Sequence, residues 1–80
     1  MVIIHLYEQR DAVSDCIRGL PADSKKQWLE QRGELTEIHV TDPAPTIHVF
    51  RSHTGIETKF FFDGNRLVFL GDHTTLGAIE

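Results

Sequence analysis

Cysteine is almost missing from this sequence, which has one, Cys16, among 80 residues. No intramolecular disulfide can form, and neither can a zinc site built from several thiolates. The cross-links that usually stabilise small secreted domains are therefore excluded. Cys16 itself falls on the apolar side of a predicted helix. We therefore expect it to be a small buried hydrophobic residue.

Long hydrophobic runs are missing as well. Residues 2–7 (VIIHLY) are apolar, but they are too few for a membrane span or a signal-peptide core, and no positively charged segment precedes them. We therefore expect a cytoplasmic protein with no membrane partner.

Basic residues are few and scattered. Eight Lys and Arg stand against 12 Asp and Glu, for a formal net charge of −4. Binding to nucleic acid without sequence preference needs a clustered basic face that releases counterions from the phosphates. We expect no direct nucleic-acid binding, although Phe50 and Phe61 could in principle stack on bases as in single-strand RNA binders.

Catalytic motifs are also missing. The six glycines are isolated, so the sequence has no phosphate-binding loop and no dinucleotide fingerprint. Candidate acid or base residues, His53 and the Asp72-His73 pair, fall in predicted loops, and the only thiol is on a helix. The sequence predicts no enzyme, no catalytic residues, no metal and no cofactor.

The remaining composition is that of an ordinary globular domain. Hydrophobic residues make up 40% and charged residues 25% of the chain. A chain of this length buries about 60–65% of its unfolded surface, which allows one modest core. We expect residues 1–80 to form one small α+β domain.

The first third of the chain predicts a strand and two helices. Residues 2–7 alternate in the manner of a buried strand. An apolar helical face is formed by Val13, Cys16, Ile17 and Leu20, in a helix that is capped by Asp11 and ended by Gly19. A second helix begins near Pro21, is capped by Asp23 or Ser24, carries Trp28 and Leu29, and ends at Gly33 in a left-handed conformation.

The rest of the chain predicts strands. Turn signals at 42–45 (DPAP), 52–55 (SHTG) and 63–65 (DGN) separate four segments, which predicts a four-stranded antiparallel β-meander with the helices packed on one face. Residues 71–80 have weak periodicity and are interpreted as a tail.

The apolar pattern predicts the strand registers. Val40 should pair with Ile47 and Ile38 with Val49, which sets His39 opposite His48. His48 should then face Lys59, and Asp63 should face Arg66. The predicted core face of the sheet holds Ile38, Val40, Ile47, Val49, Phe60, Phe62, Leu67 and Phe69.

The other face of the sheet is the candidate binding site. It should mix apolar and charged side chains, which is typical of a protein interface. Its predicted partner-binding residues are His39, His48, Phe50, Glu57, Lys59, Phe61, Arg66, Val68 and Leu70. The alternative is that the second helix, or the tail with Leu76 and Ile79, covers this face.

These observations favour a small non-enzymatic inhibitor or adaptor that binds another protein and is a monomer or a homodimer. Its size and acidic character resemble the inhibitors that phages and mobile elements make against host defence complexes, such as anti-CRISPR proteins. Binding to such a nucleic-acid-handling complex could use an acidic surface of Asp11, Asp15, Glu30 and Glu34.

The alternative function is a metal-dependent or histidine-based module. It would use His39 and His48 across two strands, with Glu37 or His5 as a further ligand.

Overall fold

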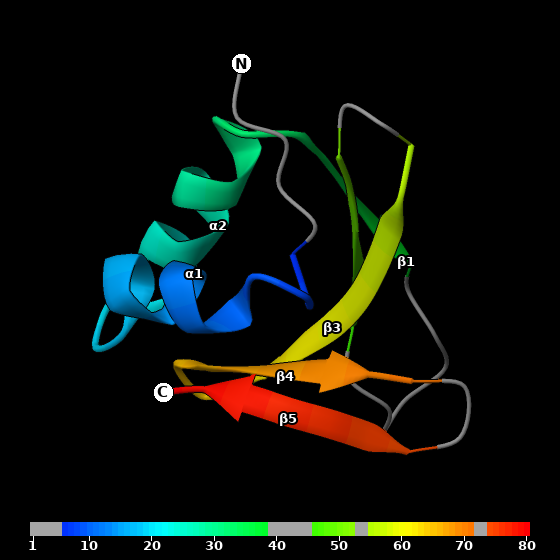
Figure 1. The fold of residues 1–80 in the computed structure, drawn as a ribbon. Helices are drawn as coiled ribbons and strands as arrows, with labels where there is room; N and C mark the ends of the chain where they lie inside the picture. The colour runs from blue at the N-terminus through cyan, green and yellow to red at the C-terminus, as the bar shows by residue number, and fades with distance from the viewer. Residues whose placement is uncertain (1–5, 39–45, 53–54, 72–73) are drawn as a thin grey trace.

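The computed structural model describes residues 6–38, 46–52, 55–71 and 74–80 (Figure 1). Two helices are followed by five strands: α1 (Arg10–Ile17), α2 (Ala22–Glu30), β1 (Glu34–Ile38), β2 (Ile47–Arg51), β3 (Glu57–Asp63), β4 (Arg66–Leu70) and β5 (Thr75–Ile79). The strands form one open antiparallel sheet whose order follows the chain. The predicted α+β class is confirmed, with a five-stranded sheet in place of the predicted four-stranded meander and separate first strand.

Both helices lie on the same side of the sheet (Figure 1). The core between the layers contains Leu6, Val13, Ile17, Leu29, Phe50, Phe60, Leu67, Phe69 and Ile79. Each fully buried phenylalanine contributes about 1.5–3 kcal/mol relative to an exposed one. No helix among the described residues is long and apolar enough to cross a membrane.

Helix α1 follows the predicted period, with Val13 and Ile17 buried against the sheet. It begins at Arg10, so the predicted cap Asp11 lies inside the first turn. The prediction that Cys16 is buried is wrong, because its side chain is exposed. Ser14, which lies on the opposite side of Val13 and Ile17 from Cys16, is buried instead.

The segment before α1 is a turn. Residues 6–9 turn directly into the helix, and the N–H of Arg10 donates to the backbone oxygen of Tyr7 at 3.2 Å. The predicted strand at 2–7 is therefore wrong for Leu6 and Tyr7, and its residues 2–5 lie outside the described residues. Leu6 still enters the core, and the Tyr7 ring meets Phe69 edge to face at 5.5 Å.

The predicted tail is wrong, because its residues 75–79 form strand β5. Val68 pairs with Ala78 and Leu67 with Ile79, so Ile79 enters the core. Leu76 stays 44% exposed. The two glycines in this segment had weakened its strand pattern in the sequence.

The hairpin of β3 and β4 has the predicted register. Asp63 pairs with Arg66 and Phe60 with Phe69, as the alternation required. Gly64 has a φ of +64°, and Asn65 has no positive φ. This combination fits a type II′ turn, which places glycine at its first central position and matches the twist of the strands.

The registers predicted for β1, β2 and β3 are wrong. Ile38 pairs with Ile47, and His48 pairs with Glu37 on one side and with Phe60 on the other. Relative to the prediction, β1 is shifted by two residues against β2, and β2 by one residue against β3. A shift by one residue moves every side chain of a strand to the other face.

The physical reason lies in β2, which carries apolar side chains on both faces. Phe50, the largest of them, fills the core opposite Leu35, and Ile47 and Val49 take the other face. Gly33 makes room for the ring, since a Cβ there would lie 2.6 Å from a Phe50 ring atom. Gly33 was predicted to adopt a left-handed conformation, but it lacks a positive φ. Its role is this close approach.

Lys25 joins distant segments beneath α2. Its side chain is 0% exposed, and its Nζ donates to the backbone oxygens of Leu20 at 2.5 Å, Asn65 at 2.5 Å and Glu80 at 3.0 Å. Burial lowers the pKa of the Lys25 ammonium, and the negative charge of Glu80 opposes that shift. The Asn65 side chain also accepts a hydrogen bond from the N–H of Ala22 at 3.1 Å, at the start of α2.

Candidate functional site

The face of the sheet opposite the helices is the candidate site, here called the open face. It consists of the even-numbered residues of β1 and β4, the odd-numbered residues of β2 and β3, and Ala78 of β5. Both described helices pack on the other face (Figure 1). The open face therefore has no helical layer among the described residues.

An apolar row crosses the open face from one edge strand to the other. Ile38 pairs with Ile47, and Phe61 pairs with Val68, which in turn pairs with Ala78. On the neighbouring strands β2 and β3, His48 pairs with Phe60. Ile47 and Phe61 are the next residues in that register, so they lie opposite each other. Ile38 is 46% exposed, Ile47 and Phe61 are half-buried, and Val68 is buried.

Charged side chains lie at the two ends of this face. Arg51 forms an ion pair with Glu57, and this contact, together with the charge of Glu34, raises the pKa of Arg51. At the other end, Arg66 lies 3.1 Å from Asp63 and 3.8 Å from Glu80. These charges are balanced within the chain.

Lys59 is the exception near the middle of the open face. It lies between Val49 and Leu70 in the register and is exposed. Within the described part of the chain, its ammonium makes no ion pair and no hydrogen bond. A surface hollow of about 480 Å³ opens beside Lys59, Leu70 and Leu76.

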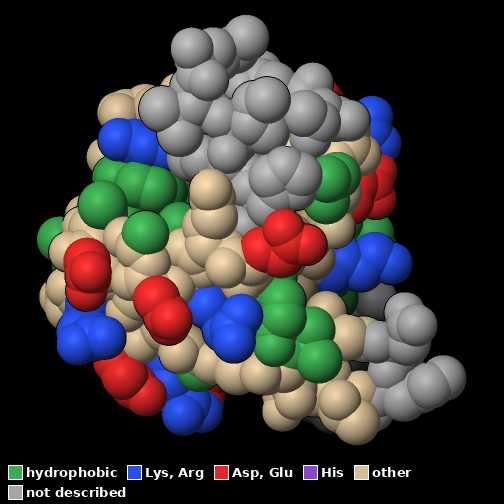
Figure 2. Space-filling view, in the orientation of Figure 1, with side chains coloured by type: hydrophobic (Ala, Val, Ile, Leu, Met, Phe, Trp, Pro, Cys, Tyr) green, Lys and Arg blue, Asp and Glu red, His purple; other side chains and the backbone are tan. Residues whose placement is uncertain are grey.

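The open face is electrically neutral as a whole. It holds three acidic side chains, Glu34, Glu57 and Asp63, and three basic ones, Arg51, Lys59 and Arg66. The formal net charge of −4 therefore belongs to the rest of the chain. Figure 2 shows acidic and basic side chains mixed over the helical side of the molecule.

The structure brings together six of the nine predicted partner-binding residues. Glu57, Lys59, Phe61, Arg66, Val68 and Leu70 all lie on the open face. Phe50 and His48 lie on the core face, where both are buried, and His39 lies outside the described residues. Because Phe50 and Phe61 are on opposite faces, they cannot stack together on nucleic-acid bases.

His48 is a packing residue at the margin of the core. It is 6% exposed and stacks on Phe60 with ring centroids 5.3 Å apart. Its Nδ1 lies 3.7 Å from Oε1 of Glu37, and the same oxygen lies 3.4 Å from Nζ of Lys26. The predicted pairings of His48 with His39 and with Lys59 are therefore wrong, because Glu37 and Phe60 occupy those pairing positions.

The predicted metal site depended on a direct pairing of His48 with His39, and the observed register differs at His48. The predicted cross-strand neighbour of His48 is replaced by Glu37. Over the residues that the structure describes, no group of three or more His, Cys, Asp or Glu side chains could hold a metal ion. The predicted further ligand His5 falls outside those residues.

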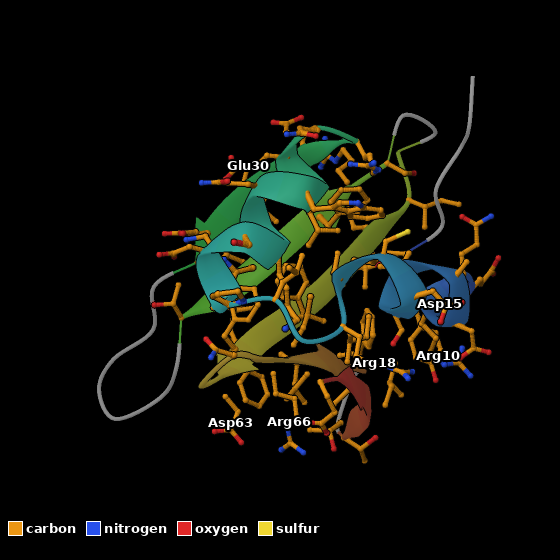
Figure 3. All side chains as sticks on the ribbon, turned by 90° about the vertical axis from the view of Figure 1, so that its left-hand side faces the viewer. Arg10, Asp15, Arg18, Glu30, Asp63 and Arg66 are labelled. Atoms are coloured by element: carbon orange, nitrogen blue, oxygen red, sulfur yellow. The ribbon has the colours of Figure 1, made fainter. Side chains whose placement is uncertain are left out.

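The predicted acidic surface is not gathered in one place. Asp11 and Asp15 lie on α1, Glu30 on α2 and Glu34 on β1, and all four are exposed. Figure 3 shows Asp15 and Glu30 at opposite ends of the helical layer, with Arg10 on the helix that carries Asp15 and Arg18 directly after that helix. These acids offer no continuous acidic surface to a basic partner.

Sequence reasoning missed Ile38, Ile47 and Val49 as members of the open face. It placed them in the core because these apolar residues recur at every second position, as regularly as the residues that are buried there. It also missed Lys25, although a signal was present: Lys25 and Leu29 are four residues apart and thus share the buried face of one helix.

Comparison of this chain with protein families, curated proteins and solved structures found no match. The open face therefore has to be interpreted from its own geometry and charge.

Proposed function

We propose that this protein is a small non-enzymatic binding module, an inhibitor or adaptor, which binds another protein through the open face. The observation that carries the proposal is the apolar row from Ile38 to Ala78 beside the unpaired Lys59. Apolar side chains rimmed by charges on a small domain are typical of a protein interface.

The charges define the kind of partner. Arg51 and Arg66 already have acidic neighbours, so Lys59 is the basic residue of the open face that has no acidic neighbour among the described residues, and we assign it to the partner. A protein surface with apolar side chains around one carboxylate would complement the open face. A nucleic acid would not, because a neutral face on an acidic chain cannot replace the counterions of many phosphates.

Phe61→Asp tests the proposal. A charge in the middle of the apolar row should lower the affinity for the partner at least about tenfold, as expected for a central aromatic residue of an interface. The partner is captured from a lysate of the organism that encodes the chain, identified by mass spectrometry and titrated against purified variants. Ala12→Asp, which adds the same charge on the exposed side of α1, is the matched control and should bind like the wild type.

Lys59→Glu supplies the charge test. Reversing this charge should weaken binding more than the neutral Lys59→Met, because a carboxylate of the partner would then face a like charge. Equal binding by wild type, Phe61→Asp and Lys59→Glu would refute the proposal. So would a loss of cooperative unfolding in Phe61→Asp, since that would assign Phe61 to the core.

A further inference from the structure

Strand β5 forms one edge of the sheet and carries no charge. Its sequence from Thr75 to Ile79 has neither a charged residue nor a proline, and residues 75–78 are exposed. Leu76 is among the most exposed large hydrophobic residues of the chain. Edge strands present backbone N–H and C=O groups to solvent, and proteins usually protect them with charges, prolines, β-bulges or a covering segment. Of these, β5 has an irregularity in its register with β4, where Phe69 pairs with Gly77 and Leu70 with Thr75.

The opposite edge has that protection. Strand β1 carries Glu34 and Glu37, and Glu37 is further held by Lys26 from α2. The difference between the two edges is therefore a difference in charge. Of the two edge strands as described, β5 is the one that another strand can approach without meeting a carboxylate of that strand.

Among the residues that the structure describes, the chain covers the β5 edge only at its end. The backbone oxygen of Glu80 accepts from the N–H of Gly19 at 3.1 Å and from Lys25, so the segment beyond Ile79 is engaged. The hydroxyl of Tyr7 reaches the backbone oxygen of Leu76 at 3.5 Å, the long limit of a hydrogen bond, in an exposed position. Residues 75–78 remain accessible from the side.

We infer that the β5 edge pairs with the β5 edge of a second copy of this chain, antiparallel and about a twofold axis near Gly77. Leu76 would then lie opposite Ala78 of the second copy, and no like charges would face each other. A strand that lacks charge gives no preference to an acidic or a basic peptide. A copy of itself matches it in length and in neutrality.

The pairing would join the two sheets side by side. Ala78 ends the apolar row of the open face at this edge, so the rows of the two copies would become continuous. The pairing uses backbone groups of β5 and not the charges of the open face. The pairing can therefore be tested independently of the proposed function.

The test is the mass in solution as a function of concentration, measured by sedimentation equilibrium on the full chain. The wild type should rise from 9.1 kDa towards twice that mass between low micromolar and millimolar concentration. Leu76→Lys should stay monomeric over this range, because the lysine of each copy would lie opposite Ala78 of the other and diagonal to the second lysine, about 7–8 Å away across the paired edge. Ile56→Lys is the matched control: it adds the same charge at a similarly exposed residue that belongs to neither the β5 edge nor the open face, and it should dimerise like the wild type.

If Leu76→Lys has a lowered unfolding midpoint, Thr75→Lys replaces it as the test variant, because residue 75 is an exposed position of the same edge. A wild type that is monomeric at millimolar concentration would overturn the inference. A dimer that both β5 variants leave intact would overturn it too, as would one abolished by Phe61→Asp but not by Leu76→Lys, since that dimer would use the open face.

Discussion

Lys25 shows how a charged residue can lie in the interior of so small a domain. Its ammonium has three protons, and three backbone oxygens accept them, from Leu20, Asn65 and Glu80. A buried charge is tolerated when its hydrogen bonds are complete. The aliphatic part of the side chain meanwhile shares the buried face of α2 with Leu29.

We expect Lys25→Met to lower the free energy of unfolding by about 2–4 kcal/mol, because it removes the donor from three buried carbonyl oxygens and leaves the volume almost unchanged. Urea unfolding followed by circular dichroism gives the value. Lys26→Met, at the adjacent half-buried lysine, removes a pair with Glu37 and should cost less than about 1 kcal/mol. Equal losses in the two variants would contradict this role for Lys25.

At the scale of elements, the β3–β4 turn supports α2 as well as its own hairpin. Neither Pro21 nor a neighbouring side chain caps the helix, and the Asn65 side chain accepts the hydrogen bond from Ala22. The first N–H groups of a helix have no partner within it, so this oxygen from a distant turn replaces a local cap.

Asn65→Ala should therefore lower the free energy of unfolding by about 1 kcal/mol, the usual effect of losing a capping oxygen. Asn65→Asp keeps the oxygen and places a negative charge at the helix start, so it should be as stable as the wild type. Thermal and urea unfolding of both variants measure the difference. If both variants lose the same stability, the capping explanation does not hold.

Predictability from sequence also differs between elements. The two helices and the β3–β4 hairpin were predictable, since Val13 and Ile17 repeat at helical spacing and the Asp-Gly-Asn turn fixes its own register. Strand β2 was not, because Ile47 and Val49 compete with Phe50 for the core, and only the packing of the ring over Gly33 decides. The open face was predicted in its β3 and β4 residues and missed in its β1 and β2 residues for the same reason.

At the scale of the whole molecule, the sheet is built from neighbours along the chain. Each strand pairs with the next, so every hairpin can close without bringing distant segments together. The helices are added on one side, and the charges on the open face sum to zero. Because both described helices pack on one face of the sheet, they cover neither of the two proposed binding regions, the open face and the β5 edge.

The hydrogen bonds of Lys25 have a kinetic consequence. Two of them connect residues 40 and 55 positions apart, so they can form only after the meander has brought Asn65 and Glu80 beneath α2. Contacts of this separation carry a loop-closure cost. We expect Lys25→Met to raise the unfolding rate and to leave the folding rate nearly unchanged in stopped-flow chevrons. A slowed folding arm would instead place Lys25 in the folding nucleus; otherwise this lysine determines how long the folded state persists.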